Sequence, residues 1–483
     1  MRLRSPVLPV VVLTAVGAAL RFTTLDRQSY WLDELVTVSL LRRDLGDMLA
    51  QIPQTEATPY LYYALAWGWA SLFGLGEAGL RSLSALVGAA MVPLSYGAGS
   101  VFVSRRVGLI AAAVVAVNPF LVWYSQEARS YSLLALLTAG TVLLFGSALR
   151  GNRRALAGWG AVSALAIATH YFAVFLVAVE AVWLLFALRP RRPAVVASIV
   201  PAIVLAAHLP LLLEQRGNAG AVAGASLASR AAGIPKNLAV GYSFPAEALG
   251  SALAAGLLLV GLGLLLTRTS PRDQLGALVA GSLAAGSIAI PLALALLGVD
   301  YVVSRNAILA VVPAAVFLGA GYAANRLGVA TAAALCILSA AISLAPAFDL
   351  RYGRTDWRGA AEVLAAPDVD RAIVVTPFMS RTLWDPYLSG LREPDAETVR
   401  VREIVVVGLA TEGGFSAGPI RPPTGPAAPP PSGFSLLEFE RRPTYTVARY
   451  RASAPRAVMV HELVRLRLST AQQPGVLFQA GAP

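Results

Sequence analysis

Long apolar runs follow one another through the first 348 residues, separated by short polar connections. The runs lie at about 5–22, 82–103, 107–123, 131–149, 155–170, 171–188, 194–213, 247–267, 275–298, 306–324 and 328–347. A bilayer core about 30 Å thick needs about 20 apolar residues per helix, and these runs are close to that length. The pattern therefore predicts an α-helical polytopic membrane protein with about eleven transmembrane helices.

Arginine occurs in every second connection between these runs, and this regularity predicts the orientation of the chain. The connections concerned carry Arg105 and Arg106, Arg150 to Arg154, Arg189 to Arg192, Arg268 and Arg272, and Arg326. Cytoplasmic connections of membrane proteins carry an excess of Lys and Arg. We therefore expect a cell (plasma) membrane protein with a cytoplasmic N-terminus and an outer C-terminal region. The first run could instead be a cleaved signal peptide, but its removal would break the alternation.

The segment from residue 23 to 81 does not follow this rhythm. It is too polar at its start to span a bilayer and too apolar at 60–75 to lie free in water. Amphipathic helices at the membrane surface have this mixed character. We expect interfacial helices in this first outer loop.

The region after Phe348 changes to mixed charge and predicts a small extracytoplasmic α/β domain at 349–483, beside a transmembrane catalytic domain at 1–348. Its strand-like stretches are 372–376 and 403–407, and 357–366 is helix-like. The stretches 434–439 and 445–451 alternate like edge strands. A Pro-rich linker at about 418–433 should be extended and poorly ordered.

Composition agrees with a lipid environment. The chain has 57% hydrophobic and 14% charged residues, whereas about 25% of residues are charged in soluble proteins. The net charge of +12 could indicate nucleic acid, but 23 of the 39 basic residues lie before Phe348, where they follow the topology pattern. No nucleic-acid partner is expected. Cys336 is the single cysteine, which excludes an intrachain disulfide and a cysteine-based metal site.

Acidic residues are crowded in the first outer loop, where seven of the 13 acids before Phe348 lie between Asp26 and Glu77. Asp33 and Glu34 follow the first run closely, so we expect them at the outer membrane surface. A carboxylate there can accept a proton from a hydroxyl group. Alternatively, Asp33 caps a helix that starts near Glu34. Spacing alone does not choose between these interpretations.

A second set of polar residues lies in other outer connections. Glu127 and Arg129 form a charged pair in an apolar neighbourhood, and Tyr131 follows them. An arginine fork suits a phosphate group, although a structural clamp between Glu127 and Arg129 is an alternative. His170 and Tyr171 end the fifth run, and Arg305 closes the ninth connection. All these residues converge on the outer side.

Three further polar residues have weaker signals. Glu180 lies in the middle of the sixth run, where an acid must be paired, protonated or in a wet cavity. We expect it to make a hydrogen bond to a neighbouring helix. His208 and Glu214 flank the seventh outer connection, but their spacing matches no metal motif.

Several motifs together resemble one known family. They are Arg21-Phe22, the 31–34 loop (Trp-Leu-Asp-Glu), 58–63 (Thr-Pro-Tyr-Leu-Tyr-Tyr), 80–85, 123–131, 169–171 and 304–306. The chain resembles the membrane glycosyltransferases of the GT-C fold over about residues 15–325, in the bacterial branch akin to protein O-mannosyltransferases and the lipid A aminoarabinose transferase. The family commonly has His-Pro-Pro where this chain has Thr58-Pro59-Tyr60, and this departure puts in doubt any ligand role that the family histidine would have.

The resemblance implies an inverting glycosyltransferase that moves mannose or another pentose or hexose from a polyprenyl-phosphate donor. It implies Asp33 as the base, Glu34 and Glu127 as supporting acids, and Arg129 and Arg305 as ligands of the donor phosphate. A substrate pocket would include Tyr60, Tyr131, His170 and Tyr171. The acceptor would be a protein, glycolipid or polysaccharide on the outer face, among membrane lipids. Dependence on a divalent metal ion stays open, and the alternative function is a transporter or flippase of lipid-linked sugars.

Overall fold

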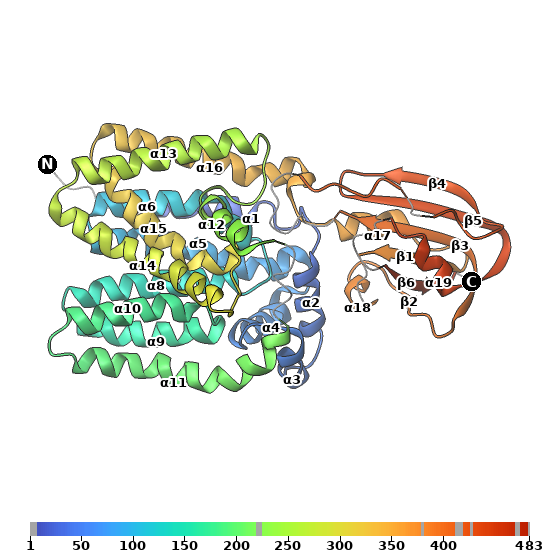
Figure 1. Cartoon of the computed structure of the whole chain (residues 1–483), viewed down its shortest axis with the longest axis horizontal. Helices are drawn as coiled ribbons and strands as arrows, with labels where there is room; N and C mark the ends of the chain where they lie inside the picture. Colours follow the sequence, from blue (N-terminus) through green and yellow to red (C-terminus); the bar gives the residue numbers. More distant parts are fainter. Residues whose placement is uncertain are drawn as a thin grey trace. The chain divides into compact units, whose positions relative to one another are not determined.

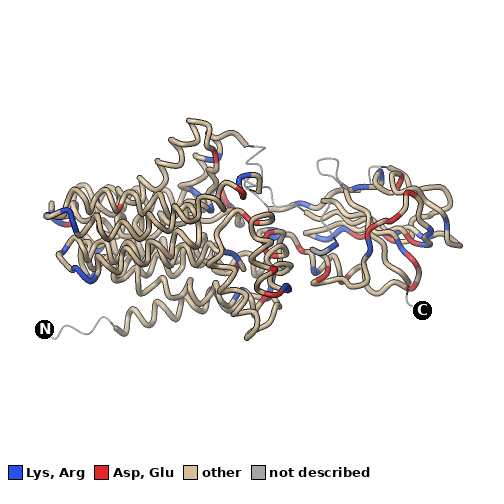
Figure 2. Tube along the Cα trace, turned by 90° about the horizontal axis from the view of Figure 1, so that it is seen from below, with Lys and Arg blue, Asp and Glu red and all other residues tan. Residues whose placement is uncertain are grey.

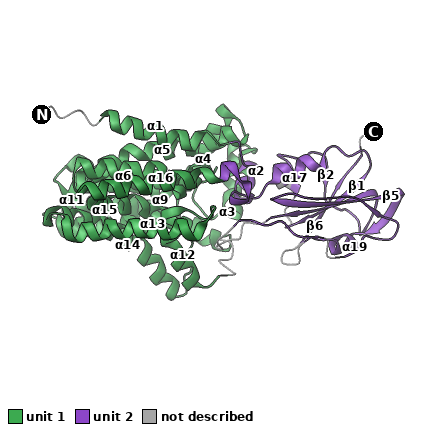
Figure 3. Cartoon of the chain, turned by 90° about the horizontal axis from the view of Figure 1, so that it is seen from above, with its two compact units in different colours: residues 1–25, 40–345 green, residues 26–39, 346–483 purple. Residues whose placement is uncertain are grey.

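The computed structural model describes residues 7–218, 225–377, 381–410, 419–425, 428–468 and 474–481 (Figure 1). The chain forms two compact units (Figure 3). The first unit contains residues 1–25 and 40–345, and the second contains 26–39 and 346–483. A short segment that follows the first helix in sequence therefore belongs to the unit built by the C-terminal part of the chain.

Each of the eleven predicted runs contains a helix of the first unit. These helices are α1 (Val7–Phe22), α5 (Glu77–Phe102), α6 (Arg105–Val117), α7 (Pro119–Ser125), α8 (Tyr131–Leu149), α9 (Arg153–Thr169), α10 (Ala173–Ala187), α11 (Arg192–Glu214), α13 (Glu247–Arg268), α14 (Pro271–Leu296), α15 (Val311–Ala323) and α16 (Arg326–Phe348). Two 3₁₀ segments, η1 (Gln215–Gly217) and η2 (Ser304–Ala310), extend the run of α11 and begin that of α15.

By length and apolar composition, seven spans in the described part of the chain can cross a membrane, and an eighth does so if α6 and α7 count as one bent span. Helices α1, α9 and α10 have 16, 17 and 15 residues and are shorter than the usual spanning length. The predicted multi-pass helical fold class is confirmed, while seven of the eleven predicted runs meet the stricter criterion in the described residues, or eight with α6 and α7 taken as one span.

The break between α6 and α7 has a local cause. Pro119 cannot donate a backbone hydrogen bond, so it begins a helix more readily than it continues one. The Asn118 side chain accepts a hydrogen bond from the Leu121 amide at 2.9 Å and caps α7. The two helices meet at an angle of 56°.

Small residues allow close packing of the helices. A Cβ atom added to Gly99 of α5 would lie 2.7 Å from the Gly108 Cα atom of α6. A Cβ atom added to Gly321 of α15 would lie 1.9 Å from the carbonyl oxygen of Gly261 in α13. Close backbone approach of this kind is how membrane helices gain packing energy without a hydrophobic driving force.

Two buried charged residues are satisfied inside the bundle. The Arg21 guanidinium donates to the carbonyl oxygens of Gly17 and Ala116 at 2.8 and 2.7 Å and joins α1 to the end of α6. Glu180 accepts hydrogen bonds from Trp159 Nε1 at 2.7 Å and Thr141 Oγ1 at 3.1 Å. The predicted hydrogen bond from Glu180 to a neighbouring helix is therefore confirmed, and it is made to both α9 and α8.

The connection between α1 and α5 contains three helices, α2 (Leu32–Leu41), α3 (Leu45–Thr55) and α4 (Leu61–Phe73). Helices were predicted here, and their position at the membrane surface stays a prediction. Helix α12 (Leu227–Val240) lies in the connection between α11 and α13.

The second unit contains a six-stranded sheet with the order β2-β6-β1-β3-β5-β4. The strands are β1 (Arg371–Thr376), β2 (Leu391–Arg392), β3 (Thr398–Leu409), β4 (Ser435–Arg441), β5 (Tyr445–Met459) and β6 (Gly475–Gln479). Strands β1 and β3 are parallel, and the other pairs are antiparallel. The 3₁₀ segment η3 (Leu350–Tyr352) and helices α17 (Trp357–Leu364), α18 (Arg381–Trp384) and α19 (Val460–Arg465) complete the unit.

The sheet corrects one prediction. Strand β4 lies at an edge, but β5 pairs with both β3 and β4 and is therefore an interior strand. Alternation along one strand shows that one face is buried, and it does not report how many neighbours the strand has. Of the Pro-rich linker, residues 419–425 and 428–433 contain no helix or strand, and the remainder lies outside the described residues.

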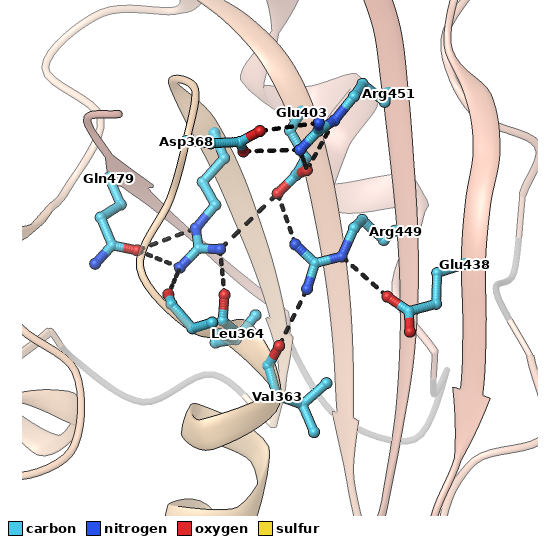
Figure 4. Close-up of polar contacts among 10 residues, drawn as sticks. Val363, Leu364, Asp368, Glu403, Glu438, Arg449, Arg451 and Gln479 are labelled. Carbon is cyan, nitrogen blue, oxygen red and sulfur yellow. Dashed lines mark hydrogen bonds and ion pairs between the residues drawn. The ribbon is translucent and has the colours of Figure 1, made fainter. Parts of the chain in front are cut away.

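A network of charged side chains is buried in the second unit (Figure 4). Glu403 on β3 is fully buried, and its carboxylate accepts from Arg449 Nη1 at 2.9 Å and from Arg451 Nη2 at 2.5 Å. Arg371 Nη1 lies 3.8 Å from the same carboxylate. Burial of the Arg371 guanidinium lowers its pKa to about 10. Arg449 also reaches the more exposed Glu438.

Candidate functional site

The two ends of the helical unit differ in their charged residues. The arginine-bearing connections α5–α6, α8–α9, α10–α11, α13–α14 and α15–α16 lie at one end, where Figure 2 shows Lys and Arg collected at the left of the unit. Arg106 Nη2 donates to the Asn325 carbonyl oxygen at 3.4 Å and joins two of these connections. The predicted site residues of this unit come from connections at the other end.

Arg129 makes a buried bidentate ion pair with Glu56. Its Nη1 and Nη2 atoms lie 2.8 and 2.7 Å from Oε1 and Oε2 of Glu56, and both side chains are less than one-tenth exposed. Arg129 follows α7, whereas Glu56 directly follows α3. Glu56 was not singled out in the sequence, because seven acids of the first loop looked alike. Its position beside Thr58-Pro59 was the signal available.

Arg305 lies against an aromatic wall. It belongs to η2, and its guanidinium carbon lies 5.7 Å from the centre of the Tyr131 ring. The Tyr131 ring in turn lies 5.6 Å from the His170 ring and 4.9 Å from the Tyr124 ring. The hydroxyl groups of Tyr124 and Tyr242 are 2.5 Å apart. Connections after α7, α9 and α14 thus bring Tyr131, His170 and Arg305 together.

His170 is held neutral at this site. Burial, and then the positive charges of Arg305 and Arg129, lower its pKa to about 3. Its Nδ1 atom accepts a hydrogen bond from the Phe172 amide at 3.2 Å, so the proton of the neutral ring is assigned to Nε2. His170 can donate one hydrogen bond there and is not a source of positive charge.

Helix α12 holds the segment that carries Arg305. Arg230 donates to Asp300 Oδ1 at 3.0 Å and to the Val302 carbonyl oxygen at 2.5 Å. Asn237 Nδ2 donates to Ser304 Oγ at 2.9 Å. Because these contacts flank Arg305 closely in sequence, they restrict where its backbone can lie.

A small apolar pocket adjoins this segment. It is lined by side chains of η2 and its neighbours, namely Phe172, Ile234, Ser287, Ile288, Pro291, Val302, Val303, Asn306 and Ala307. Its lining includes Val303 and Asn306, which are close to Arg305 in sequence.

Tyr60 and Tyr171 lie in a second polar group. Tyr171 Oη donates to Gln215 Oε1 at 2.8 Å, and Gln215 Nε2 donates to the Thr58 carbonyl oxygen at 3.1 Å. Burial and the charge of Glu214 raise the pKa of Tyr60. Thr58 stands where the resembled family commonly has histidine. Its hydroxyl group forms a hydrogen bond with the Tyr63 hydroxyl group, with 3.1 Å between the two oxygens. Tyr63 lies under Arg129, with 5.9 Å between the guanidinium carbon and the ring centre.

Asp33 and Glu34 belong to the second unit. Helix α2 begins at Leu32, so Asp33 lies inside its first turn and is not its N-cap. Glu34 makes the side-chain hydrogen bond at the start of the helix instead. Its Oε2 atom accepts from the Trp31 amide at 3.3 Å. The alternative interpretation of Asp33 as a helix cap is therefore wrong. Its proximity to Arg129 and Arg305 stays a prediction.

Metal ligands do not gather in the described residues, where no group of three or more His, Cys, Asp and Glu side chains is placed to hold one ion. His208 makes a contact within α11 instead, between its Nδ1 atom and the Val204 carbonyl oxygen at 2.8 Å.

Residues 57–213 match the model of the dolichyl-phosphate-mannose-protein mannosyltransferase family. This range contains Glu127, Arg129, Tyr131, His170 and Tyr171, and it confirms the resemblance predicted from the motifs. A search of curated proteins gives no match.

Several solved structures are similar at low identity. ArnT from Cupriavidus metallidurans bound to undecaprenyl phosphate is 15% identical, with a TM-score of 0.47 over 65% of this chain and 60% of that one. The oligosaccharyltransferase AglB from Archaeoglobus fulgidus is 13% identical, with a TM-score of 0.47 over 71% of this chain and 55% of that one. The S. cerevisiae Pmt1-Pmt2 complex is 18% identical, with a TM-score of 0.34 over 44% of this chain and 35% of that one.

This chain thus covers less than two thirds of each of these proteins. All three TM-scores lie below 0.5, so the proposals below are supported by the family match and by the residues of this chain.

Proposed function

We propose that this protein is an inverting glycosyltransferase that moves a sugar from a polyprenyl-phosphate donor to an acceptor at the outer face of the cell membrane. The observation that carries the proposal is the meeting of Arg305, Tyr131 and His170 at the end of the helical unit opposite the arginine-rich connections. The family match over residues 57–213 supports the reaction class. The N-terminus is cytoplasmic in this proposal, because arginine-rich connections face the cytoplasm.

The proposed reaction is a single displacement at the anomeric carbon of the donor sugar. Asp33 takes a proton from the acceptor hydroxyl, the acceptor oxygen forms a bond to the anomeric carbon, and the bond to the phosphate oxygen breaks. Polyprenyl phosphate leaves with the electron pair of that bond. Because attack comes from the face opposite the leaving group, the anomeric configuration inverts.

Arg305 has the chemistry required at the leaving group. A guanidinium fixed by its surroundings stabilises the negative charge that develops on a departing phosphate. The aromatic side chains beside it suit the apolar face of a sugar. His170, being neutral, can donate a hydrogen bond to a phosphate or sugar oxygen without adding charge.

Arg129 is already part of an ion pair. Both of its terminal nitrogens already bind Glu56, so a phosphate must share the guanidinium or displace the carboxylate. Arg129 therefore supplies positive charge and fixes the loop, while Arg305 is the principal ligand of the phosphate. In this proposal Glu127 is a supporting acid, and Tyr131, Tyr60 and Tyr171 contact the substrate.

The proposal is tested with purified protein in lipid nanodiscs and a panel of polyprenyl-phosphate sugars. Release of polyprenyl phosphate is measured together with sugar transfer to protein, glycolipid and polysaccharide acceptors. NMR of the product should show the inverted anomeric configuration. Arg305→Gln should reduce release about 10²-fold or more, whereas Arg268→Gln, at the opposite end of the unit, should not. Movement of intact donor across a vesicle membrane without bond cleavage would instead show the flippase alternative.

A further inference from the structure

The segment that carries Asp33 is bound by the C-terminal part of the chain. Residues 26–39 cluster with residues 346–483, although more than 300 residues separate the two in sequence. Three consecutive residues, Gln28, Ser29 and Tyr30, make hydrogen bonds to residues of the C-terminal part of the chain. These contacts lie within one compact unit and precede Asp33 by only three to five residues.

Ser29 is the central contact of this segment. Its hydroxyl donates to the Thr355 carbonyl oxygen at 3.0 Å and accepts from the Trp357 amide at 2.9 Å. Trp357 is the first residue of α17, so Ser29 satisfies one of the amides that a helix start leaves without an intrahelical partner. The Ser29 side chain is buried, and both of its partners would lose their hydrogen bond if the hydroxyl were removed.

The neighbours of Ser29 are fixed in the same way. Gln28 Oε1 accepts from the Arg354 amide at 2.8 Å, and the Tyr30 amide donates to Tyr387 Oη at 2.7 Å. The C-terminal residues that bind this segment are themselves held in place by packing. The buried rings of Trp357 and Trp384 pack edge to face with their centres 4.9 Å apart.

Little conformational freedom is left between this anchor and Asp33. Three residues span at most about 10 Å from Tyr30 to Asp33. The Trp31 amide is tied to Glu34 Oε2, and Thr37 Oγ1 donates to the Asp33 carbonyl oxygen at 3.1 Å. The backbone position of Asp33 within the second unit is therefore set by residues of the C-terminal part of the chain.

We infer that the C-terminal unit is a positioning element for the catalytic base, and that Ser29 is the positioning residue that connects it to Asp33. This inference rests on the proposed function, in which Asp33 takes the acceptor proton. Displacement of a catalytic group by about 1 Å reduces turnover up to about 10²-fold. A loosened anchor should therefore reduce kcat and leave donor binding unchanged.

The test compares Ser29→Ala, Ser29→Thr and Tyr387→Phe with the wild type in the polyprenyl-phosphate release assay. Ser29→Ala should reduce kcat about tenfold or more while the donor KM stays within about twofold. Ser29→Thr keeps the hydroxyl and should restore most of the activity. Tyr387→Phe removes only the oxygen that accepts from Tyr30 and should act in the same direction. Ser435→Ala is the matched control, because its hydroxyl is exposed and contacts the Arg451 carbonyl oxygen at 3.4 Å.

A double variant separates positioning from a general structural effect. If Ser29 acts through Asp33, Ser29→Ala should cause no further loss in the Asp33→Asn protein. Independent losses that multiply, or full activity of both Ser29→Ala and Tyr387→Phe beside an inactive Asp33→Asn, would overturn the inference alone. Full activity of Asp33→Asn would overturn the proposed role of Asp33 and the inference with it. Thermal unfolding of each variant identifies any that fail to fold.

Discussion

Arg129 and Glu56 form a two-point ion pair, with Nη1 and Nη2 of the arginine 2.8 and 2.7 Å from the two carboxylate oxygens. The residues are 73 positions apart and come from different connections of the helical unit. The pair therefore fixes the connection between α1 and α5 to the segment that carries Glu127 and Tyr131. It also controls the charge of the site, since one carboxylate balances one of the two site arginines.

The first prediction concerns this pair. Glu56→Gln keeps the shape of the side chain but leaves Arg129 buried without its carboxylate, and it should destabilise the protein by about 3–5 kcal/mol. The double replacement Glu56→Leu with Arg129→Met should recover much of this loss, because neither member of the pair is left as an uncompensated charge. Thermal unfolding in detergent measures both variants. Equal melting temperatures for Glu56→Gln and the wild type would contradict the structural role of the pair.

An exposed pair provides the control for that experiment. Arg351 and Asp349 are also joined by a short ion pair, but Arg351 is open to solvent. Exposed pairs contribute little because water solvates both partners when they separate. Arg351→Gln should leave the melting temperature close to that of the wild type.

The second prediction concerns the pH dependence of stability at His170. Its pKa falls from 6.5 to about 3 in the folded protein, so the unfolded chain binds a proton that the native chain excludes. The free energy of unfolding should therefore decrease as the pH falls below 6.5 toward 3, by up to about 1.4 kcal/mol per pH unit. His170→Asn keeps an acceptor for the Phe172 amide and does not titrate. Between pH 6.5 and 5 its melting temperature should decline less than that of the wild type, and equal slopes would contradict the assignment.

The third prediction concerns Glu403 in the second unit. Glu403→Gln removes the carboxylate shared by Arg449 and Arg451 beside the buried Arg371, and should cost about 3–5 kcal/mol. Glu438→Gln is the matched control, because Glu438 also contacts Arg449 but its side chain is 51% exposed. Unfolding followed by near-ultraviolet circular dichroism should show a large shift for the first variant and a small one for the second. Similar shifts for both would argue against the network of Figure 4 as a core element.

Much of the helical unit could be predicted because a bilayer imposes a simple rule on sequence. Every spanning segment must satisfy its own backbone hydrogen bonds, so long apolar runs become helices. The same rule identified Glu180 as a residue that needs a partner, and Trp159 and Thr141 supply it. The sequence could not show that Glu56, among seven loop acids, is the partner of Arg129, because that choice depends on contacts between distant connections.

The second unit illustrates the same limit. Strands β1 and β3 were recognisable as apolar runs, whereas β6 and α19 are short and were not predicted. The anchoring of Ser29 to Thr355 and Trp357 could not be foreseen either, since no local pattern links residues more than 300 positions apart. A serine just before a helix is usually interpreted as the cap of that helix. Ser29 precedes α2, but its hydroxyl accepts from the first amide of α17.

The most direct test of the proposed mechanism is the rate at which Asp33→Asn releases polyprenyl phosphate from a saturating donor in the presence of acceptor. Asparagine has nearly the same shape as aspartate and cannot take the acceptor proton, so the rate should fall about 10²–10⁴-fold. Asp47→Asn, an exposed acid in the first turn of α3, should keep the wild-type rate. A correctly folded Asp33→Asn protein that releases polyprenyl phosphate as fast as the wild type would contradict the role of Asp33 as the base.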